Sequence, residues 1–187
     1  MWQIVNMRVS SGFARGKNLK VPKIPGVRVS QEIVRQAIFS ILSERILNTI
    51  CLDLYAGSGS IGIEALSKGA TWCDFVDINP EATQTIKENL KATSFDLNSR
   101  VFTQDSLKYV GNCGKSYDLI FMDPYYDQAV HKHIFKTLPM ILKKEGILIF
   151  LHGKDIKIED LLLNSSFSLR ETRKYGASYV TFLILKS

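Results

Sequence analysis

A glycine-rich segment between a predicted strand and a predicted helix constrains the fold of this chain more than any other feature. Residues 57–62 follow the pattern G-x-G-x-x-G and lie between a strand expected at 50–54 and a helix expected near 60–68. Asp77 lies 20 residues after the first glycine, at the end of the next expected strand. Glycines let the backbone approach a ligand closely, and an acid at that strand end accepts hydrogen bonds from ribose hydroxyls. This order and spacing predict a site for an adenosine-containing cofactor.

Expected strands and helices alternate along most of the chain, which is typical of a doubly wound α/β sheet. Besides the elements around the glycines, we expect strands at 72–77, 100–103, 117–122 and 147–151, and helices at 30–48, 80–92 and 128–142. Two further strands, at 167–174 and 178–185, indicate an antiparallel hairpin that closes one edge of the sheet. The predicted fold class is α/β, with a doubly wound, mostly parallel, seven-stranded Rossmann-like sheet.

The net charge of +6 is concentrated in the N-terminal part of the chain. Residues 1–31 contain six basic residues and no acidic residue, and the charges of the remaining residues cancel. Apolar residues and glycines are interspersed, which favours a β-hairpin, with strands near 4–10 and 17–21, over a solvated tail. An ordered basic hairpin on a neutral body predicts a polyanionic partner such as nucleic acid. We therefore expect a hairpin extension at 1–29, a main domain at 30–187, and nucleic-acid contacts from Arg8, Arg15, Lys17, Lys20 and Arg28.

The composition argues against several other classes of protein. The longest strongly apolar stretch, residues 147–151, is far shorter than the ~18 residues that a membrane-spanning helix needs. No charged leader followed by a long apolar stretch opens the chain, so we expect no signal peptide. The three cysteines form no C-x-x-C pair, which argues for free thiols in a reducing compartment and against a zinc site. We expect a cytoplasmic protein with no membrane association and no metal.

Asp53 helps to separate two cofactors that both contain an adenosine ribose. It lies inside the strand before the glycines, where a carboxylate repels the pyrophosphate of NAD and attracts the ammonium and sulfonium of S-adenosylmethionine. Alternatively, Asp53 only anchors the loop through backbone N–H groups. Asp105 and Ser106 follow the third strand and are placed to meet the adenine, although Asp105 is equally suited to cap a helix. The candidate cofactor-binding residues are Asp53, Tyr55, Ala56, Gly57, Ser58, Gly59, Asp77, Ile78, Asp105 and Ser106.

The candidate catalytic residues Asp123, Pro124, Tyr125 and Tyr126 directly follow the fourth expected strand. Ligands of such folds bind beyond the carboxyl ends of the strands, although Asp-Pro is also a common way to open a turn. The amino group of a nucleobase is a poor nucleophile because its lone pair is delocalised into the ring. The Asp123 carboxylate and a backbone carbonyl fixed by Pro124 can accept both N–H bonds and localise that lone pair toward a methyl donor, while an aromatic ring stacks on the base. Positioning then supplies most of the acceleration, and no metal is needed.

These residues resemble those of a known family, the bacterial methyltransferases that methylate the exocyclic N2 of one guanine in 16S ribosomal RNA. The resemblance covers nearly the whole chain and is carried by residues 8–20, 28–39, 52–60, the loop at Asp123, and 174–176. The glycine loop is shared by many methyltransferases. Its combination with the N-terminal segment and Lys174-Tyr175-Gly176 is much more specific.

The resemblance implies a class I methyltransferase sheet, S-adenosyl-L-methionine over the glycine loop, and 16S rRNA of the assembling small ribosomal subunit as substrate and partner. The chain departs from the family at Tyr125, where the family usually has a second proline, so the loop gains an N–H and loses one fixed φ angle. Tyr126 holds the stacking position by register. Val29 and Ser30 stand where the family tends to have Pro-Thr, and Ser30 keeps a hydroxyl.

Several alternatives stay open from the residues. The amino group that is methylated can belong to DNA adenine or to a protein amide, although no segment is long enough for a separate DNA-reading domain. An NAD-dependent oxidoreductase is disfavoured by Asp53 and by the lack of a catalytic acid–base pair. An RNA-binding protein with a degenerate site is a further alternative because of Tyr125. We expect a monomer.

Overall fold

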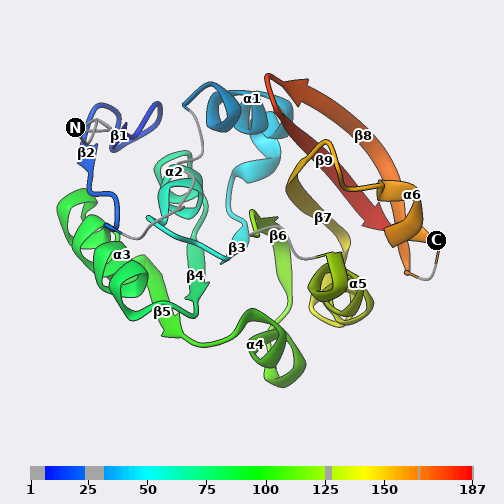
Figure 1. The fold of residues 1–187 in the computed structure, drawn as a ribbon. Helices are drawn as coiled ribbons and strands as arrows, with labels where there is room; N and C mark the ends of the chain where they lie inside the picture. Colours follow the sequence, from blue (N-terminus) through cyan, green and yellow to red (C-terminus); the bar gives the residue numbers. More distant parts are fainter. Residues whose placement is uncertain (1–6, 24–31, 125–127, 164, 187) are drawn as a thin grey trace.

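The computed structural model describes residues 7–23, 32–124, 128–163 and 165–186. Seven strands form one sheet in the order β5-β4-β3-β6-β7-β9-β8, and β1 and β2 form a separate two-stranded hairpin (Figure 1). The sheet strands are β3 (Ile50–Leu54), β4 (Trp72–Asp77), β5 (Ser99–Thr103), β6 (Tyr117–Met122), β7 (Leu142–Gly153), β8 (Phe167–Tyr175) and β9 (Ser178–Leu185). Strands β5, β4, β3, β6 and β7 run parallel, and β9 lies antiparallel to both β7 and β8. The predicted α/β sheet with a C-terminal antiparallel hairpin is confirmed.

Helices cover both faces of this sheet (Figure 1). One face packs against α1 (Glu32–Leu42), α2 (Ser60–Ser67) and α3 (Pro80–Thr93), which share a hydrophobic cluster with residues from both ends of the chain. The other face packs against α4 (Ser106–Asn112), α5 (Gln128–Thr137) and α6 (Ile158–Leu162) through a second cluster. Two clusters on opposite sides explain why strands such as β6 are apolar at almost every position.

The local signals for α3 work as the sequence predicts. The Asn79 side chain caps the helix by accepting hydrogen bonds from the N–H groups of Glu81 (2.8 Å) and Ala82 (3.4 Å). Pro80 occupies the first helical position, where its missing N–H costs no hydrogen bond and its φ angle suits the helix. Together these two residues define the end of the loop that follows β4.

Three element boundaries differ from the expectation. The helix expected to reach residue 48 ends at Leu42 and continues as a 3₁₀ turn over Ser43–Ile46. The helix expected to reach residue 142 ends at Thr137, because Pro139 cannot continue an α-helix and restricts the residue before it. Strand β7 consequently begins early, at Leu142, and extends to Gly153.

The N-terminal hairpin is present but its strands are short. β1 (Met7–Arg8) and β2 (Asn18–Leu19) comprise two residues each, whereas strands near 4–10 and 17–21 were expected; residues 4–6 lie outside the described part of the chain. The hairpin contributes four buried apolar side chains to the cluster of α1–α3, namely Met7, Val9, Ala14 and Leu19. Hydrophobic burial therefore holds the basic segment against the main domain.

Candidate functional site

The carboxyl ends of the parallel strands bring most of the predicted site residues to one edge of the sheet. Asp77, at the end of β4, accepts a hydrogen bond from the Gly57 N–H (2.9 Å) and another from the Asn79 N–H (2.9 Å). This carboxylate thus connects the glycine turn after β3 with the start of α3. The spacing of 20 residues thus brings Asp77 into direct contact with the glycine turn, and its predicted contact with a ribose stays a prediction.

The glycine turn is shaped for close packing. Gly59 has φ +74° and caps α2, and a Cβ on Gly62 would lie 2.3 Å from the Phe75 ring. The positive φ of Gly59 is a backbone conformation that favours glycine. The lack of a side chain at Gly62 lets α2 pack directly on β4. Tyr55, the residue after β3, has φ +58°, which is unusual for a residue with a side chain. Such conformations cluster at ligand sites.

Asp53 is almost completely buried, with 2% of its surface exposed. Its carboxylate accepts a hydrogen bond from the Gly62 N–H (2.9 Å), so the anchoring role considered as an alternative is present. Burial raises the pKa of this carboxyl well above 3.8, the Gly62 hydrogen bond opposes that shift, and the charges of Asp123 and Asp77 raise the pKa further. The structure therefore places Asp77 and Asp123 close enough to Asp53 to influence its charge.

Further predicted cofactor-binding residues follow β4 and β5. Ile78 directly follows β4, and 67% of the surface of this apolar residue is exposed. Asp105 caps α4 by accepting from the Lys108 N–H (2.9 Å), so its capping role is observed. Burial raises the pKa of Tyr55 to about 12, the charge of Asp105 raises it too, and a hydrogen bond with Ser106 lowers it. Tyr55, Asp105 and Ser106 therefore lie together.

The predicted cofactor-binding residues Ala56 and Ser58 make contacts of different kinds. The Ala56 N–H donates to the Val76 carbonyl (3.1 Å), and its own carbonyl accepts from the Gly59 N–H (2.7 Å), which closes the turn beside β4. The Ser58 side chain is buried and points to the Met7 sulfur (3.5 Å). Any cofactor contact of Ser58 must therefore involve its backbone.

Asp123 and Pro124 directly follow β6, next to the glycine turn of the neighbouring strand β3. Asp123 is half-buried and Pro124 is buried. The other two predicted catalytic residues, Tyr125 and Tyr126, lie outside the described residues, so the stacking role of Tyr126 stays a prediction. The electrostatic influence of Asp123 on Asp53 places the predicted catalytic acid close to the predicted cofactor acid.

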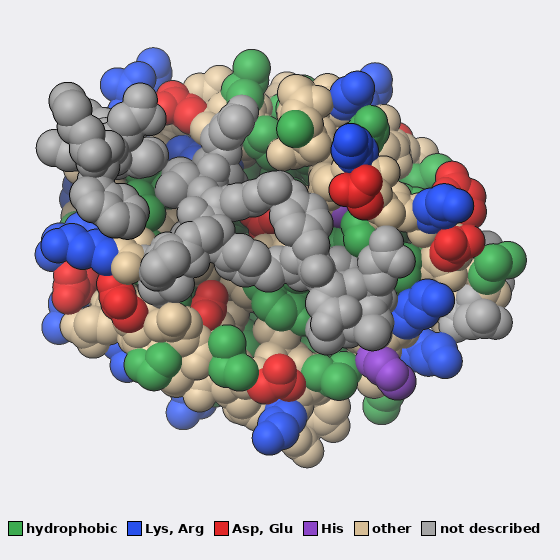
Figure 2. Space-filling view, in the orientation of Figure 1, with side chains coloured by type: hydrophobic (Ala, Val, Ile, Leu, Met, Phe, Trp, Pro, Cys, Tyr) green, Lys and Arg blue, Asp and Glu red, His purple; other side chains and the backbone are tan. Residues whose placement is uncertain are grey.

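Four of the five predicted nucleic-acid contacts are exposed on the hairpin, and Arg28 lies outside the described residues. The Lys17 ammonium donates to the Ala92 carbonyl in α3 (3.0 Å), and the Lys20 ammonium pairs with Glu88 (2.7 Å). Arg8 lies 3.6 Å from Glu32, and Arg15 is exposed. Figure 2 shows Lys and Arg side chains along the left rim of this face, over the hairpin and α3.

Two buried polar residues that the sequence did not single out hold this hairpin in place. Glu64 of α2, with 0% exposure, accepts hydrogen bonds from the N–H and hydroxyl groups of Ser10 and Ser11 and lies 3.7 Å from the Arg35 guanidinium. Asn89 of α3 exchanges hydrogen bonds with the Lys20 backbone and donates to the Ser58 carbonyl (2.9 Å). Glu64 is the one acidic residue in the otherwise apolar or small-residue segment 60–67, and this isolated charge was the sequence feature that could have indicated a buried polar role.

His152 lies within β7, one residue before the strand ends, and is a satisfied structural histidine. Its Nδ1 hydrogen bonds with the Gly153 carbonyl (2.9 Å) and its Nε2 with the Thr181 hydroxyl (2.8 Å). Burial lowers the pKa of the His152 ring, and the Gly153 hydrogen bond opposes that shift.

Within the described ranges, no group of three or more His, Cys, Asp or Glu side chains is arranged to hold a metal ion. Those same ranges include no helix that is long and apolar enough to cross a membrane.

Comparisons with known proteins agree with this architecture. The solved structure of a hypothetical protein from Thermus thermophilus is 29% identical, with a TM-score of 0.79 over 96% of this chain and 99% of that one. Ribosomal RNA small subunit methyltransferase D of Escherichia coli (strain K12) is 34% identical over 132 residues, covering 71% of this chain and 66% of the relative. The protein of the same name from Buchnera aphidicola subsp. Acyrthosiphon pisum (strain APS) is 30% identical over 86% of this chain and 84% of its own length.

The family model described as conserved hypothetical protein 95 matches residues 7–184, from the first described residue of the hairpin almost to the end of the sheet. The relatives with this extent of similarity are methyltransferases, as the sequence resemblance implied. The chain belongs to the conserved hypothetical protein 95 family, and the methyltransferase family predicted from its sequence is confirmed.

Proposed function

We propose that this methyltransferase transfers a methyl group from S-adenosylmethionine to the exocyclic N2 amine of a guanine in 16S rRNA. The observation that carries the proposal is the group of carboxylates at the ends of three adjacent strands, Asp77 on β4, Asp53 on β3 and Asp123 after β6. The names of the relatives supply the substrate class, small-subunit ribosomal RNA. Ribosome assembly takes place in the cytoplasm, where we expect the protein to act as a monomer.

The described residues fit S-adenosylmethionine better than a dinucleotide. Asp77 is oriented by two backbone N–H groups and has further lone pairs for ribose hydroxyls, while Ile78 offers an apolar surface to the adenine. The buried Asp53 carboxylate favours a cation and disfavours a pyrophosphate. When bound, S-adenosylmethionine supplies a methyl group on a positively charged sulfur. The protein residues bind and orient it over the glycine turn.

Asp123 and the carbonyl of Pro124 act on the guanine amine. Each accepts one N–H of the amine, which localises the nitrogen lone pair for attack. The bound cofactor would supply the methyl group to that lone pair and leave as S-adenosylhomocysteine, and the Asp123 carboxylate would take the amine proton. Most of the acceleration comes from this positioning.

Replacing Asp53 with asparagine is expected to weaken S-adenosylmethionine binding while leaving the fold at least as stable. The asparagine oxygen still accepts the Gly62 N–H, but the buried charge is gone. Because folding raises the pKa of this carboxyl above 3.8, ionisation of Asp53 disfavours the folded state increasingly as the pH rises. A cationic ligand favours the ionised carboxylate, so wild-type affinity rises with pH up to the raised pKa, and this dependence disappears in Asp53→Asn. Calorimetric titration across pH, together with thermal unfolding, checks both effects; unchanged affinity would leave Asp53 with the anchoring role alone.

The cofactor assignment has a direct test. Calorimetry is expected to show binding of S-adenosylhomocysteine, the product of the cofactor, and no binding of NAD. Binding of NAD without binding of S-adenosylhomocysteine would replace the proposed function with an oxidoreductase.

Neutralising Arg8, Arg15 and Lys17 together is expected to weaken binding of 16S rRNA and to flatten its dependence on salt. Each phosphate contact contributes roughly −0.7 to −0.9 to the slope of log affinity against log salt, so loss of three contacts changes the slope by about 2 to 3. The control replaces Lys144 and Lys157, two exposed lysines away from the hairpin, with alanine. Filter binding over a range of salt concentrations makes the measurement. An unchanged slope with normal S-adenosylhomocysteine affinity would remove the hairpin from the RNA interface.

A further inference from the structure

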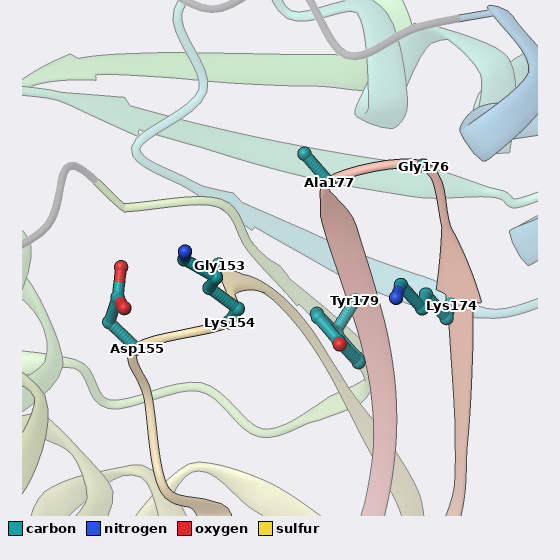
Figure 3. A pocket seen from close by; sticks show the side chains of 7 residues that line it. All are labelled: Gly153, Lys154, Asp155, Lys174, Gly176, Ala177 and Tyr179. Atoms are coloured by element: carbon teal, nitrogen blue, oxygen red, sulfur yellow. The ribbon is translucent and has the colours of Figure 1, made fainter.

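A pocket of about 390 Å³ lies outside the predicted cofactor site, between two loops at the end of the sheet (Figure 3). One side is the loop at the end of β7, and the other is the β8–β9 turn. Lys154 and Asp155 line the first side, and Lys174 and Tyr179 line the second. Its volume lies in the range of small-molecule sites, roughly 300–1,000 Å³.

The strand order gives the position of this pocket relative to the predicted cofactor and catalytic residues. The predicted cofactor residues follow β3, β4 and β5, and the proposed catalytic residue Asp123 follows β6. The pocket lies on the opposite side of β6, at the ends of β7 and β9. Along the sheet, Asp123 therefore lies between the predicted cofactor residues and this pocket, and a substrate whose amine meets Asp123 can extend into it.

Aromatic rings lead from the core to the pocket. Phe150 stacks on His152 with ring centroids 5.0 Å apart, and His152 stacks on Tyr179 with centroids 5.6 Å apart and planes 14° apart. The register of β7 and β9 explains the second contact, because His152 and Tyr179 are direct cross-strand partners. Tyr179 is half-buried and lines the pocket, so the stack ends in a ring that is supported from behind.

Two lysines flank this ring from opposite sides of the pocket. Lys174 is the cross-strand partner of Tyr179 in β8, and its ammonium lies over the ring, 5.7 Å from the centre. Because β7 and β8 flank β9 on opposite sides, this is the face opposite His152, and a stacking base takes it as the exposed Lys174 side chain turns toward the nucleotide's phosphate. Lys154 follows β7 on the other side, as Figure 3 shows. Both are exposed, and neither forms an ion pair within 4.0 Å among the described residues. The Asp155 carboxylate at the same opening disfavours an isolated anion, so a ligand with a stacking ring fits better than free phosphate.

We propose that this pocket binds the nucleotide next to the methylated guanine, with its base stacked on Tyr179 and its phosphates near Lys154 and Lys174. An aromatic platform combined with cations is the usual chemistry for holding an unpaired nucleotide. A guanine that enters the site beyond β6 leaves its own base stack, and its neighbour in the chain then needs a replacement surface. The proposal rests on the proposed function, since it takes RNA to be the substrate.

The test measures binding of transcribed 16S rRNA in the presence of S-adenosylhomocysteine. Tyr179→Leu is expected to bind on the order of ten-fold more weakly, whereas Tyr179→Phe, which keeps the ring, binds like the wild type. The double variant Lys154→Ala, Lys174→Ala should reduce the salt slope by about 1.4, whereas the control Lys144→Ala, Lys157→Ala leaves it unchanged. Normal affinity for S-adenosylhomocysteine shows that each variant is folded. In turnover, the KM for rRNA is expected to rise more than kcat falls.

Equal RNA affinity of Tyr179→Leu and Tyr179→Phe would overturn the proposal, and so would failure of the wild type to bind the transcript. Because binding is measured without methyl transfer, the proposed function fails in a different way. A wild-type protein that binds the transcript with the expected dependence on Tyr179 but transfers no methyl group contradicts the proposed chemistry and leaves the pocket assignment intact.

Discussion

Replacing Asp123 with alanine is expected to lower kcat for methyl transfer by about 10²–10³-fold, the usual effect of removing one preorganised polar group from a reaction centre. The same change should leave cofactor affinity equal or higher. The charge of Asp123 is one of the causes that raise the pKa of Asp53, so its removal makes ionisation of Asp53 easier and favours a cationic cofactor. Loss of rate without loss of cofactor binding is therefore the expected signature.

A matched pair of variants isolates this effect. Asp123→Asn keeps the shape and one acceptor but removes the charge, whereas Asp118→Asn makes the same change at the other end of β6. Asp118 pairs with Lys143 (2.8 Å), away from the site, so its variant should retain the wild-type kcat. Single-turnover transfer of labelled methyl groups measures the chemical step. A wild-type rate in Asp123→Ala would rule out the proposed role of the carboxylate.

Replacing Glu64 with alanine is expected to lower the free energy of unfolding by about 3–5 kcal/mol, the usual cost of removing one partner from a buried ion pair. Arg35, with 1% of its side chain exposed, would keep its charge in the core. Burial already lowers the pKa of Arg35, while the charge of Glu64 opposes that shift. Ser10 and Ser11 would also lose the acceptor that holds the hairpin on α2. The hairpin should therefore open before the rest of the protein unfolds.

Urea unfolding and amide hydrogen exchange measure these two effects. Glu64→Gln keeps an acceptor for the serines and should lose less stability. Glu88→Ala removes the exposed partner of Lys20 and should change stability very little, because exposed pairs are screened by water. Adding Arg35→Met to Glu64→Ala should restore part of the loss, since no buried charge then lacks its partner. If Glu64→Ala were as stable as Glu88→Ala, the buried pair would have no role in holding the hairpin.

The sequence was informative where one local signal determines one local structure. The spacing of the glycines and Asp77 corresponds to an actual hydrogen bond, and Asn79 with Pro80 marks the start of α3. The apolar stretches predicted the central strands β3, β6 and β7, because strands buried on both faces have few polar positions. The edge strands β5 and β8 are mostly exposed and have a weaker apolar signal. Pro139 carried the signal that ends α5, but the expected helix ran past it.

The side-chain contacts that could not be predicted mostly join residues far apart in the sequence. Glu64 and Asn89 bind backbone groups more than 50 residues away in the sequence, so no local pattern shows their partners. The Ser58 side chain, expected at the cofactor, points instead to Met7 of the hairpin, 51 residues away in the sequence. The short helix α6 has only five residues and no strong capping signal, which makes it hard to distinguish from a loop. The aromatic stack of Phe150, His152 and Tyr179 arises from the pairing of β7 with β9.

The measurement that tests the central claim most directly identifies the methylated nucleoside. Small ribosomal subunits from cells lacking this protein are incubated with the purified protein and labelled S-adenosylmethionine, and the rRNA is digested to nucleosides and analysed by mass spectrometry. We predict label in N2-methylguanosine at a single position of 16S rRNA, and none when the protein carries Asp123→Ala. Label in another nucleoside, in DNA or in ribosomal protein, or no transfer to the subunits at all, would contradict the account.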